Sequence, residues 1–173
     1  FGITTLAKWE DHKKLNKTVY RRFERYLMLI GIGYVMHFHQ LSLSWLMGLP
    51  DERLAVVTRV DALQHIGFAL MIAEGLVLVL RKKSIYLPTI ATLLIAAVIS
   101  APWVWNIDVS GLPIPVAAFV NNATGSIFPI VPWCGFLFSG ILVARFVQAR
   151  RKKPMGLMQL VVPLAIIAAA LIF

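Results

Sequence analysis

The sequence predicts an all-α fold, a polytopic bundle of about five transmembrane helices, and its composition and hydropathy both lead to this prediction. Hydrophobic residues make up 59% of the 173 residues and charged residues only 14%, against about 45–50% and about 25% in a typical globular chain. The mean hydropathy is +0.77, although the net charge is +9. This composition excludes a soluble domain and an intrinsically disordered chain, which needs low hydrophobicity. It also excludes nucleic acid as a partner, because a basic nucleic-acid footprint lies on a polar surface.

Five stretches are long and apolar enough to cross a bilayer, which takes about 20 residues in a helix. The predicted spans cover residues 26–49, 62–80, 85–105, 127–148 and 156–173. The connections are too short for a further domain, so we expect residues 1–173 to form a single transmembrane domain. Both ends of the sequence fall within apolar stretches, so we expect the chain to be part of a longer one.

The basic residues predict the orientation of these spans. Fifteen of the seventeen lysines and arginines fall in the N-terminal segment and in the connections around residues 81–83 and 145–153. Because Lys and Arg accumulate in short cytoplasmic loops, we expect the N-terminus and these two connections to be cytoplasmic. The same groups are also suited to attract anionic lipid headgroups or the phosphates of a coenzyme.

Two histidines lie in the outer half of the first predicted span. His37 and His39 are two residues apart, so they point about 200° away from each other on a helix and cannot bind one metal ion together. Cys134 is the single cysteine, and no metal site is predicted. Two interpretations of the histidines stay open: a position at headgroup level, or a catalytic role as proton acceptor or acyl carrier.

Polar residues also open the second predicted span. Asp61, Gln64 and His65 follow the i, i+3, i+4 spacing of one helix face, and Arg59 lies just before them. Asp61 suits the N-cap position, where a carboxylate accepts from free backbone amides. The functional interpretation is a polar cluster at the outward mouth of a cavity, in which Arg59, Asp61 and Gln64 bind substrate and His65 is a further catalytic candidate.

Glu74 is the one carboxylate deep within a predicted span. A charge at mid-bilayer costs roughly 2.5–3.5 kcal/mol on insertion scales, so the side chain must face the bundle interior. Because no Lys or Arg is expected at its depth, we expect a hydrogen-bonded and protonated Glu74, and we include it among the candidate substrate-binding residues.

The third connection and the fourth predicted span carry packing signals. The connection is poor in charge, which predicts that it folds back against the bundle. Pro129 and Pro132 at the start of the fourth span predict a kink, and small residues farther along permit close helix contact.

Three segments in order resemble a known family of membrane acyltransferases. They are Tyr20-Arg-Arg-Phe followed by Gly31-x-Gly33, then Arg59-Val-Asp-Ala-Leu-Gln-His-Ile-Gly67, then Phe128-Pro-Ile-Val-Pro-Trp-x-Gly-Phe-x-x-x-Gly140. Their order and spacing over roughly residues 18–148 are similar to those of the heparan-alpha-glucosaminide N-acetyltransferase type. The resemblance implies an enzyme that transfers an acyl group from cytoplasmic acyl-CoA to a sugar on the outer side.

The chain departs from that family pattern at one important point. The family's essential histidine lies upstream of anything that aligns here, so no catalytic residue is carried over. The aligned positions are Arg59, Asp61, Gln64, Pro132 and Trp133, as architectural or mouth-lining residues.

Two functions therefore follow from the sequence. The first is an acyltransferase-like membrane protein, with acyl-CoA as donor and a histidine as base. The alternative is a non-enzymatic subunit of a larger membrane complex, in which a histidine binds haem or a chlorin pigment. In either case the partners are the lipid bilayer and other membrane subunits or a second copy of the chain.

Overall fold

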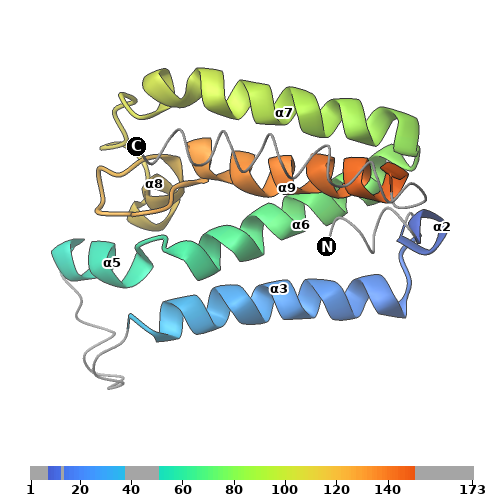
Figure 1. Cartoon of the computed structure of the whole chain (residues 1–173). Coiled ribbons are helices and arrows are strands. Elements are labelled where there is room, and N and C mark those ends of the chain that lie inside the picture. Colours follow the sequence, from blue (N-terminus) through green and yellow to red (C-terminus); the bar gives the residue numbers. More distant parts are fainter. Residues whose placement is uncertain (1–7, 13, 38–50, 151–173) are drawn as a thin grey trace, which may run out of the picture.

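The computed structural model describes residues 8–12, 14–37 and 51–150, and this part of the chain contains helices and loops without any strand (Figure 1). The helices are α2 (Trp9–His12), α3 (Lys17–Val35), α5 (Asp51–Thr58), α6 (Ala62–Leu80), α7 (Lys83–Val104), α8 (Ile114–Val120) and α9 (Ile130–Arg150). Three of them, α6, α7 and α9, are long and apolar enough to cross a membrane. The predicted all-α fold class is confirmed.

The helices agree with three of the predicted spans and differ from the first. The spans predicted over 62–80, 85–105 and 127–148 correspond to α6, α7 and α9. Helix α3 begins at Lys17, nine residues before the start of the span predicted over 26–49, so the helix is longer on this side than the predicted apolar stretch. The side chain of Asn16 caps this start by accepting from the backbone N–H of Val19 at 2.9 Å. Residues 38–50 and 156–173 lie outside the described residues, so the end of the first span and the fifth span stay predictions.

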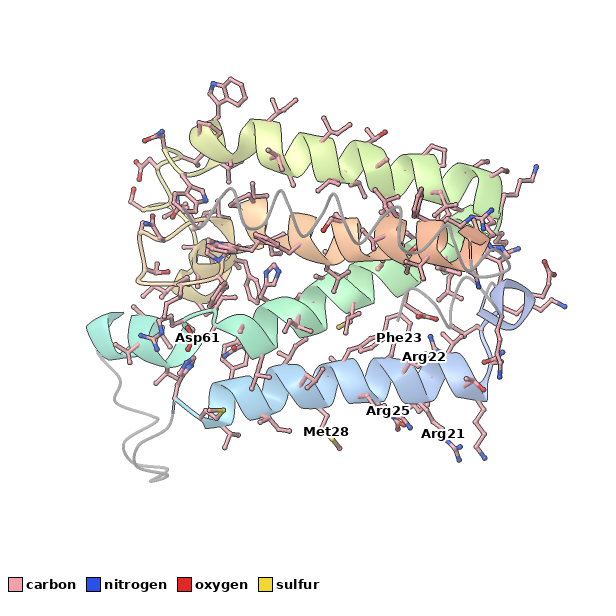
Figure 2. All side chains as sticks on the ribbon, in the orientation of Figure 1. Arg21, Arg22, Phe23, Arg25, Met28 and Asp61 are labelled. Carbon is pink, nitrogen blue, oxygen red and sulfur yellow. The ribbon has the colours of Figure 1, made fainter. Side chains whose placement is uncertain are left out.

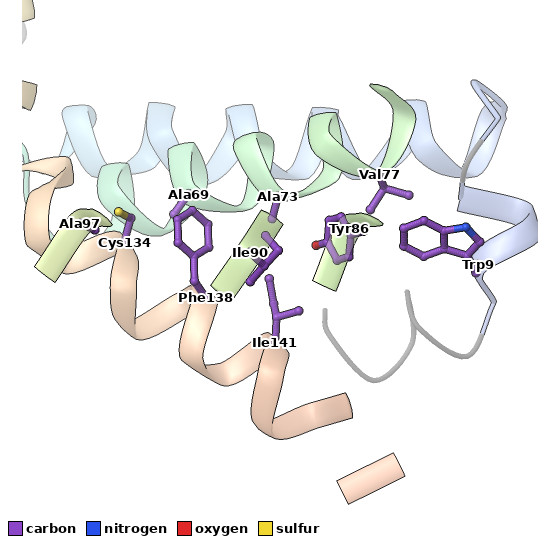
Figure 3. Packing of buried hydrophobic residues seen from close by; sticks show 10 residues of the cluster. All are labelled: Trp9, Ala69, Ala73, Val77, Tyr86, Ile90, Ala97, Cys134, Phe138 and Ile141. Carbon is purple, nitrogen blue, oxygen red and sulfur yellow. The ribbon is translucent and has the colours of Figure 1, made fainter. Parts of the chain in front are cut away.

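Helix α6 lies at the centre of the bundle, between α3 on one side and the pair of α7 and α9 on the other (Figure 1). Its face toward α7 and α9 carries small residues: Ala69 and Ala73 are buried and allow Phe138 of α9 to approach (Figure 3). Inside a membrane, close packing of this kind stabilises helix pairs, because lipid tails are as apolar as the side chains. Tyr86 and Ile90 of α7, both without solvent exposure, complete this core.

The basic segments of the chain meet at one end of the bundle. The start of α3, the end of α6, the start of α7 and the end of α9 all lie there (Figure 1). Trp9 ties α2 to this end, since its indole N–H donates to the carbonyl of Arg81 at 3.3 Å and its ring lies 5.1 Å from that of Tyr86. We call this the basic end. Its exposure to the cytoplasm remains a prediction.

At the opposite end, the connection between α7 and α9 folds back onto the bundle, as the sequence predicts. It forms α8, whose Ala117 and Ala118 are buried, and Phe119 packs 4.3 Å from Phe68 of α6 between ring centroids. Asn121 closes the loop, donating from Nδ2 to the carbonyl of Ile107 at 2.9 Å.

The first residues of α6 and α9 are joined by backbone hydrogen bonds. The carbonyl of Val60 accepts from the N–H groups of Ile127 at 3.2 Å and Phe128 at 3.0 Å. The backbone N–H of Val60 donates to the hydroxyl of Ser126 at 3.1 Å. Helix α9 then contains the predicted kink, since Val131 has non-helical angles of φ −101° and ψ 129°. The two helices thus start side by side and run in the same direction.

Candidate functional site

Helices α3 and α6 run antiparallel and place their polar side chains against each other. On α3, one face carries residues spaced by three or four positions, which is the spacing of a single helical stripe. These residues are Arg22, Tyr26, Ile30 and Gly33, and His37 continues the spacing in the turn just after the helix ends. The facing stripe of α6 runs in the opposite order: Glu74, Gly67, Gln64 and Asp61. Two polar contacts result, one at each end of the helix pair, with close packing between them.

The first contact lies at the end away from the basic segments. Nε2 of His37 lies 2.7 Å from Oδ2 of Asp61, and Nη2 of Arg59 donates to the same oxygen at 3.2 Å. The His37 side chain is 9% exposed and that of Asp61 is 29% exposed. A carboxylate bound to one imidazole nitrogen fixes the orientation and tautomer of the ring, so Asp61 holds His37 in a defined position.

The start of α6 positions Asp61 in turn. Asp61 is the N-cap residue, as predicted, in an extended conformation. Its backbone N–H donates to Oε1 of Gln64 at 3.2 Å, which is the return bond of a capping box. Gln64 is fully buried and presses against Gly33, where a Cβ would come within 2.6 Å of Cδ of Gln64. Gly33 therefore makes room for the glutamine that orders the cluster.

The cluster retains hydrogen-bonding capacity for a ligand. Oδ1 of Asp61 and Nε of Arg59 are buried and have no hydrogen-bond partner among the described residues. Buried polar atoms are normally satisfied, so an acceptor and a donor left open on two side chains that contact each other indicate a place for a polar group from outside the chain. We call His37, Arg59, Asp61 and Gln64 the outer cluster.

His65 does not join the outer cluster, which corrects the expectation that Asp61, Gln64 and His65 share one face. Its ring lies on the side of α6 that faces α9, beside the backbone of Phe128 and Trp133. Gln64, by contrast, faces α3. The i, i+3, i+4 spacing covers a broad arc of a helix, and α3 and α9 approach this arc from its two edges.

Glu74 lies in the second polar contact, near the basic end, and the expectation of a Glu74 without a nearby cation was wrong. Nη1 of Arg22 lies 3.4 Å from Oε2 of Glu74, and the Tyr26 hydroxyl lies 3.5 Å from the same oxygen. Glu74 is fully buried and Arg22 is 20% exposed. Arg22 turns toward α6 while Arg21 and Arg25 point away from it (Figure 2). Because the long Arg side chain reaches inward from a helix end, it pairs with a carboxylate several residues deeper.

Sequence reasoning missed Arg22 and Tyr26 as partners of Glu74. The available signal was their i, i+4 spacing on the same stripe as His37. This spacing was overlooked because the first span was expected to begin at Tyr26, so that Arg22 was assigned to a loop and not to a helix. Glu74 therefore belongs to a structural contact between α3 and α6 and is separate from the outer cluster.

A pocket of about 680 Å³ lies at the basic end, lined by Lys14, Leu15, Leu78, Arg81 and Lys82. The pocket combines three cationic side chains with two leucines. This combination suits a ligand that carries an anionic group on a less polar remainder. Arg81 holds a left-handed backbone conformation at φ 51°, which ends α6 and begins the turn into α7. The basic end thus offers a site for phosphate groups.

The remaining histidine candidate and the pigment alternative gain no support. His39 lies outside the described residues. Nε2 of His37, the atom that would be needed for axial ligation, is bonded to Asp61.

Comparison with known proteins gives one match. The chain matches the family described as heparan-alpha-glucosaminide N-acetyltransferase, catalytic, over residues 2–172. No curated protein and no solved structure is significantly similar to the chain.

Proposed function

Because the chain belongs to the heparan-alpha-glucosaminide N-acetyltransferase catalytic family, we propose that it transfers an acyl group from acyl-CoA to a sugar acceptor. The chain is an integral membrane protein of an acyltransferase-like family, with three helices suited to span the bilayer. The proposal assigns the donor to the basic end and the acceptor to the outer cluster.

The observation that carries this proposal is the separation of two chemically different sites at opposite ends of α6. The cationic pocket at Lys14, Arg81 and Lys82 suits the phosphates of coenzyme A. The outer cluster at Asp61 has open hydrogen-bonding atoms that suit hydroxyl or amine groups. The 19 residues of α6 span about 28 Å at 1.5 Å each, which is close to the hydrocarbon thickness of a membrane.

In the proposed reaction, His37 acts as the general base. With Nε2–H donating to Asp61, a neutral imidazole has Nδ1 as its basic nitrogen. In this proposal the phosphates of coenzyme A stay at the basic end, and its pantetheine arm extends along the bundle and brings the thioester to the outer cluster. Nδ1 of His37 then takes the proton as the acceptor oxygen or nitrogen forms its bond to the thioester carbonyl carbon. The carbon–sulfur bond then breaks, and the coenzyme A thiolate takes up a proton. Arg59 and Asp61 hold the neighbouring polar groups of the acceptor. The family match assigns no residue roles, so the role of His37 rests on its contact with Asp61 alone.

The test is acyl transfer by the full chain in proteoliposomes, with radiolabelled acetyl-CoA and glucosamine. Asp61→Asn keeps the size of the side chain but removes the charge that orients His37. We expect it to lower the rate on the order of 10²–10⁴-fold, the usual contribution of a general base. Asp108→Asn is the matched control, since Asp108 is an exposed loop aspartate at the same end, and its rate should equal that of the wild type. Absence of label transfer by the wild-type protein would overturn the proposed function, whereas full activity of Asp61→Asn would overturn the role of the outer cluster.

A further inference from the structure

A second cavity, distinct from the outer cluster, lies between the first turns of α6 and α9. It measures about 550 Å³ and is lined by Ala62, His65, Ile66, Phe128, Trp133, Phe136 and Leu137. The backbone bonds of Val60 hold the two helix starts together beside it. We call it the α6–α9 pocket.

The walls of the α6–α9 pocket are aromatic and aliphatic, with two exceptions. Phe128 and Trp133 meet edge to face with ring centroids 4.9 Å apart, and Trp133 stacks on Phe136 at 5.7 Å. Phe136 is 72% exposed and Ile66 is 41% exposed, so the pocket opens on a face of two helices that suit the membrane. A hydrocarbon chain entering from the bilayer fits these walls.

The two exceptions are polar ring nitrogens, one in His65 and one in Trp133, and each of them is left open. Nδ1 of His65 and Nε1 of Trp133 are buried and have no hydrogen-bond partner among the described residues. His65 itself is only 7% exposed. Leaving a buried donor or acceptor unsatisfied is destabilising, so two in one pocket indicate a missing polar partner.

The two atoms require a partner of one particular kind. An indole N–H is only a donor. A neutral imidazole carries its N–H on one nitrogen and accepts at the other, so with the N–H on Nε2 the open Nδ1 of His65 is an acceptor. A hydroxyl group satisfies both, because it accepts from the indole and donates to Nδ1. An ester or a hydrocarbon cannot donate.

We propose that the α6–α9 pocket binds a membrane lipid alcohol, a molecule with one long hydrocarbon chain and a hydroxyl group between Trp133 and His65. Both residues lie in the first turns of their helices, at the depth where lipid polar groups reside. Leu137 lies about one turn deeper along α9, so the chain extends toward the bilayer centre. Both nitrogens belong to side chains that line the pocket.

The test is photolabelling of the full chain in nanodiscs with hexadecanol that carries a diazirine on its chain. The comparison probes are the corresponding hexadecane and hexadecyl methyl ether, which cannot donate. We expect the alcohol to label residues of the α6–α9 pocket at least about fivefold more than either comparison probe, since the loss of one hydrogen bond costs about 1 kcal/mol, or a factor of about five.

Two variants remove one hydrogen-bonding atom each. Trp133→Phe keeps an aromatic ring but lacks the N–H, and His65→Leu lacks the acceptor. Each should lower labelling by the alcohol about fivefold, because one of its two hydrogen bonds is lost. His65→Asn, which retains a polar atom near the position of Nδ1, should restore part of it. Trp103→Phe, at an exposed tryptophan outside the pocket, is the matched control and should label like the wild type.

Equal labelling by the alcohol and the hydrocarbon would overturn the proposal and assign the pocket to ordinary bilayer lipid. Labelling by the alcohol that is unchanged in both Trp133→Phe and His65→Leu would also overturn it. Because the readout is binding, the result is independent of whether acyl transfer is observed.

Discussion

Gly67 of α6 lies directly against Ile30 of α3. A Cβ at Gly67 would fall 2.6 Å from Cγ1 of Ile30 and 2.9 Å from the carbonyl oxygen of Tyr26. The second contact is with backbone, which cannot turn aside as a side chain can. The close approach of the two helices that carry the outer cluster therefore depends on a glycine at this position.

Gly67→Ala should push α6 away from α3 and lower stability. Overpacking of this kind costs typically 1–3 kcal/mol, more than the gain of about 1 kcal/mol in helix propensity. Gly75→Ala is the matched control on the same helix, because a Cβ there meets nothing within 4 Å. Unfolding of both variants by SDS, followed by tryptophan fluorescence, should show a loss for Gly67→Ala and none for Gly75→Ala. Equal stability of the two would contradict the helix contact.

Gly33→Ala should disturb the outer cluster through Gln64. The new Cβ would lie within 2.6 Å of Gln64 Cδ and 2.7 Å of its Oε1, the atom that accepts from the Asp61 backbone. We expect a lower rate of acyl transfer with little change in the KM for acetyl-CoA, because the disturbance is at the acceptor end. Gly31→Ala, with nothing within 4 Å, should retain the wild-type rate. A wild-type rate in Gly33→Ala would show that Gln64 adjusts without moving Asp61.

Removing one partner of the Arg22–Glu74 pair should destabilise the protein. Breaking a buried ion pair costs about 3–5 kcal/mol, and we expect the lower end of this range because Arg22 is partly exposed. Glu74→Gln leaves the guanidinium without its carboxylate, whereas the double variant Arg22→Met with Glu74→Gln should recover part of the loss. Arg25→Met is the control, since Arg25 is exposed on the same helix. Additive losses in the double variant would argue against direct pairing.

The cationic pocket at the basic end should govern the affinity for the donor. Lys82→Gln and Lys14→Gln should each raise the KM for acetyl-CoA by about tenfold, which corresponds to about 1.4 kcal/mol, and leave kcat nearly unchanged. Lys17→Gln provides the control, because Lys17 is exposed at the same end but does not line the pocket. The contribution should shrink as added salt screens the charges. A larger effect of Lys17→Gln than of Lys82→Gln would place the donor elsewhere.

The orientation of the bundle can be measured with single cysteines in a Cys134→Ser background. Asp108→Cys, in the exposed loop opposite the basic end, should react with a membrane-impermeant maleimide in intact cells. Lys82→Cys should react only after permeabilisation, since Lys and Arg mark cytoplasmic loops. The reverse pattern would invert the predicted orientation and with it the sides assigned to donor and acceptor.

The sequence was sufficient for those features that depend on local pattern. The lengths of the apolar stretches located α6, α7 and α9 closely. The preference of Asp for the N-cap position predicted the role of Asp61, and the prolines predicted the kink at Val131. Features that depend on which helices contact each other could not be predicted from the sequence. The pairing of Glu74 with Arg22 requires α3 to begin at Lys17 and to face α6, and the separation of His65 from Gln64 requires α9 to cover the other edge of α6.

The two polar contacts between α3 and α6 have a mechanical consequence. Antiparallel helices joined at a single point can slide along or pivot about that point, but these two are fastened by Arg22–Glu74 near one end and by His37–Asp61 near the other. A shift by one helical turn, about 5.4 Å, would break both contacts at once. Sliding of α3 along α6 is therefore opposed at two places, and the register between the two helices is fixed.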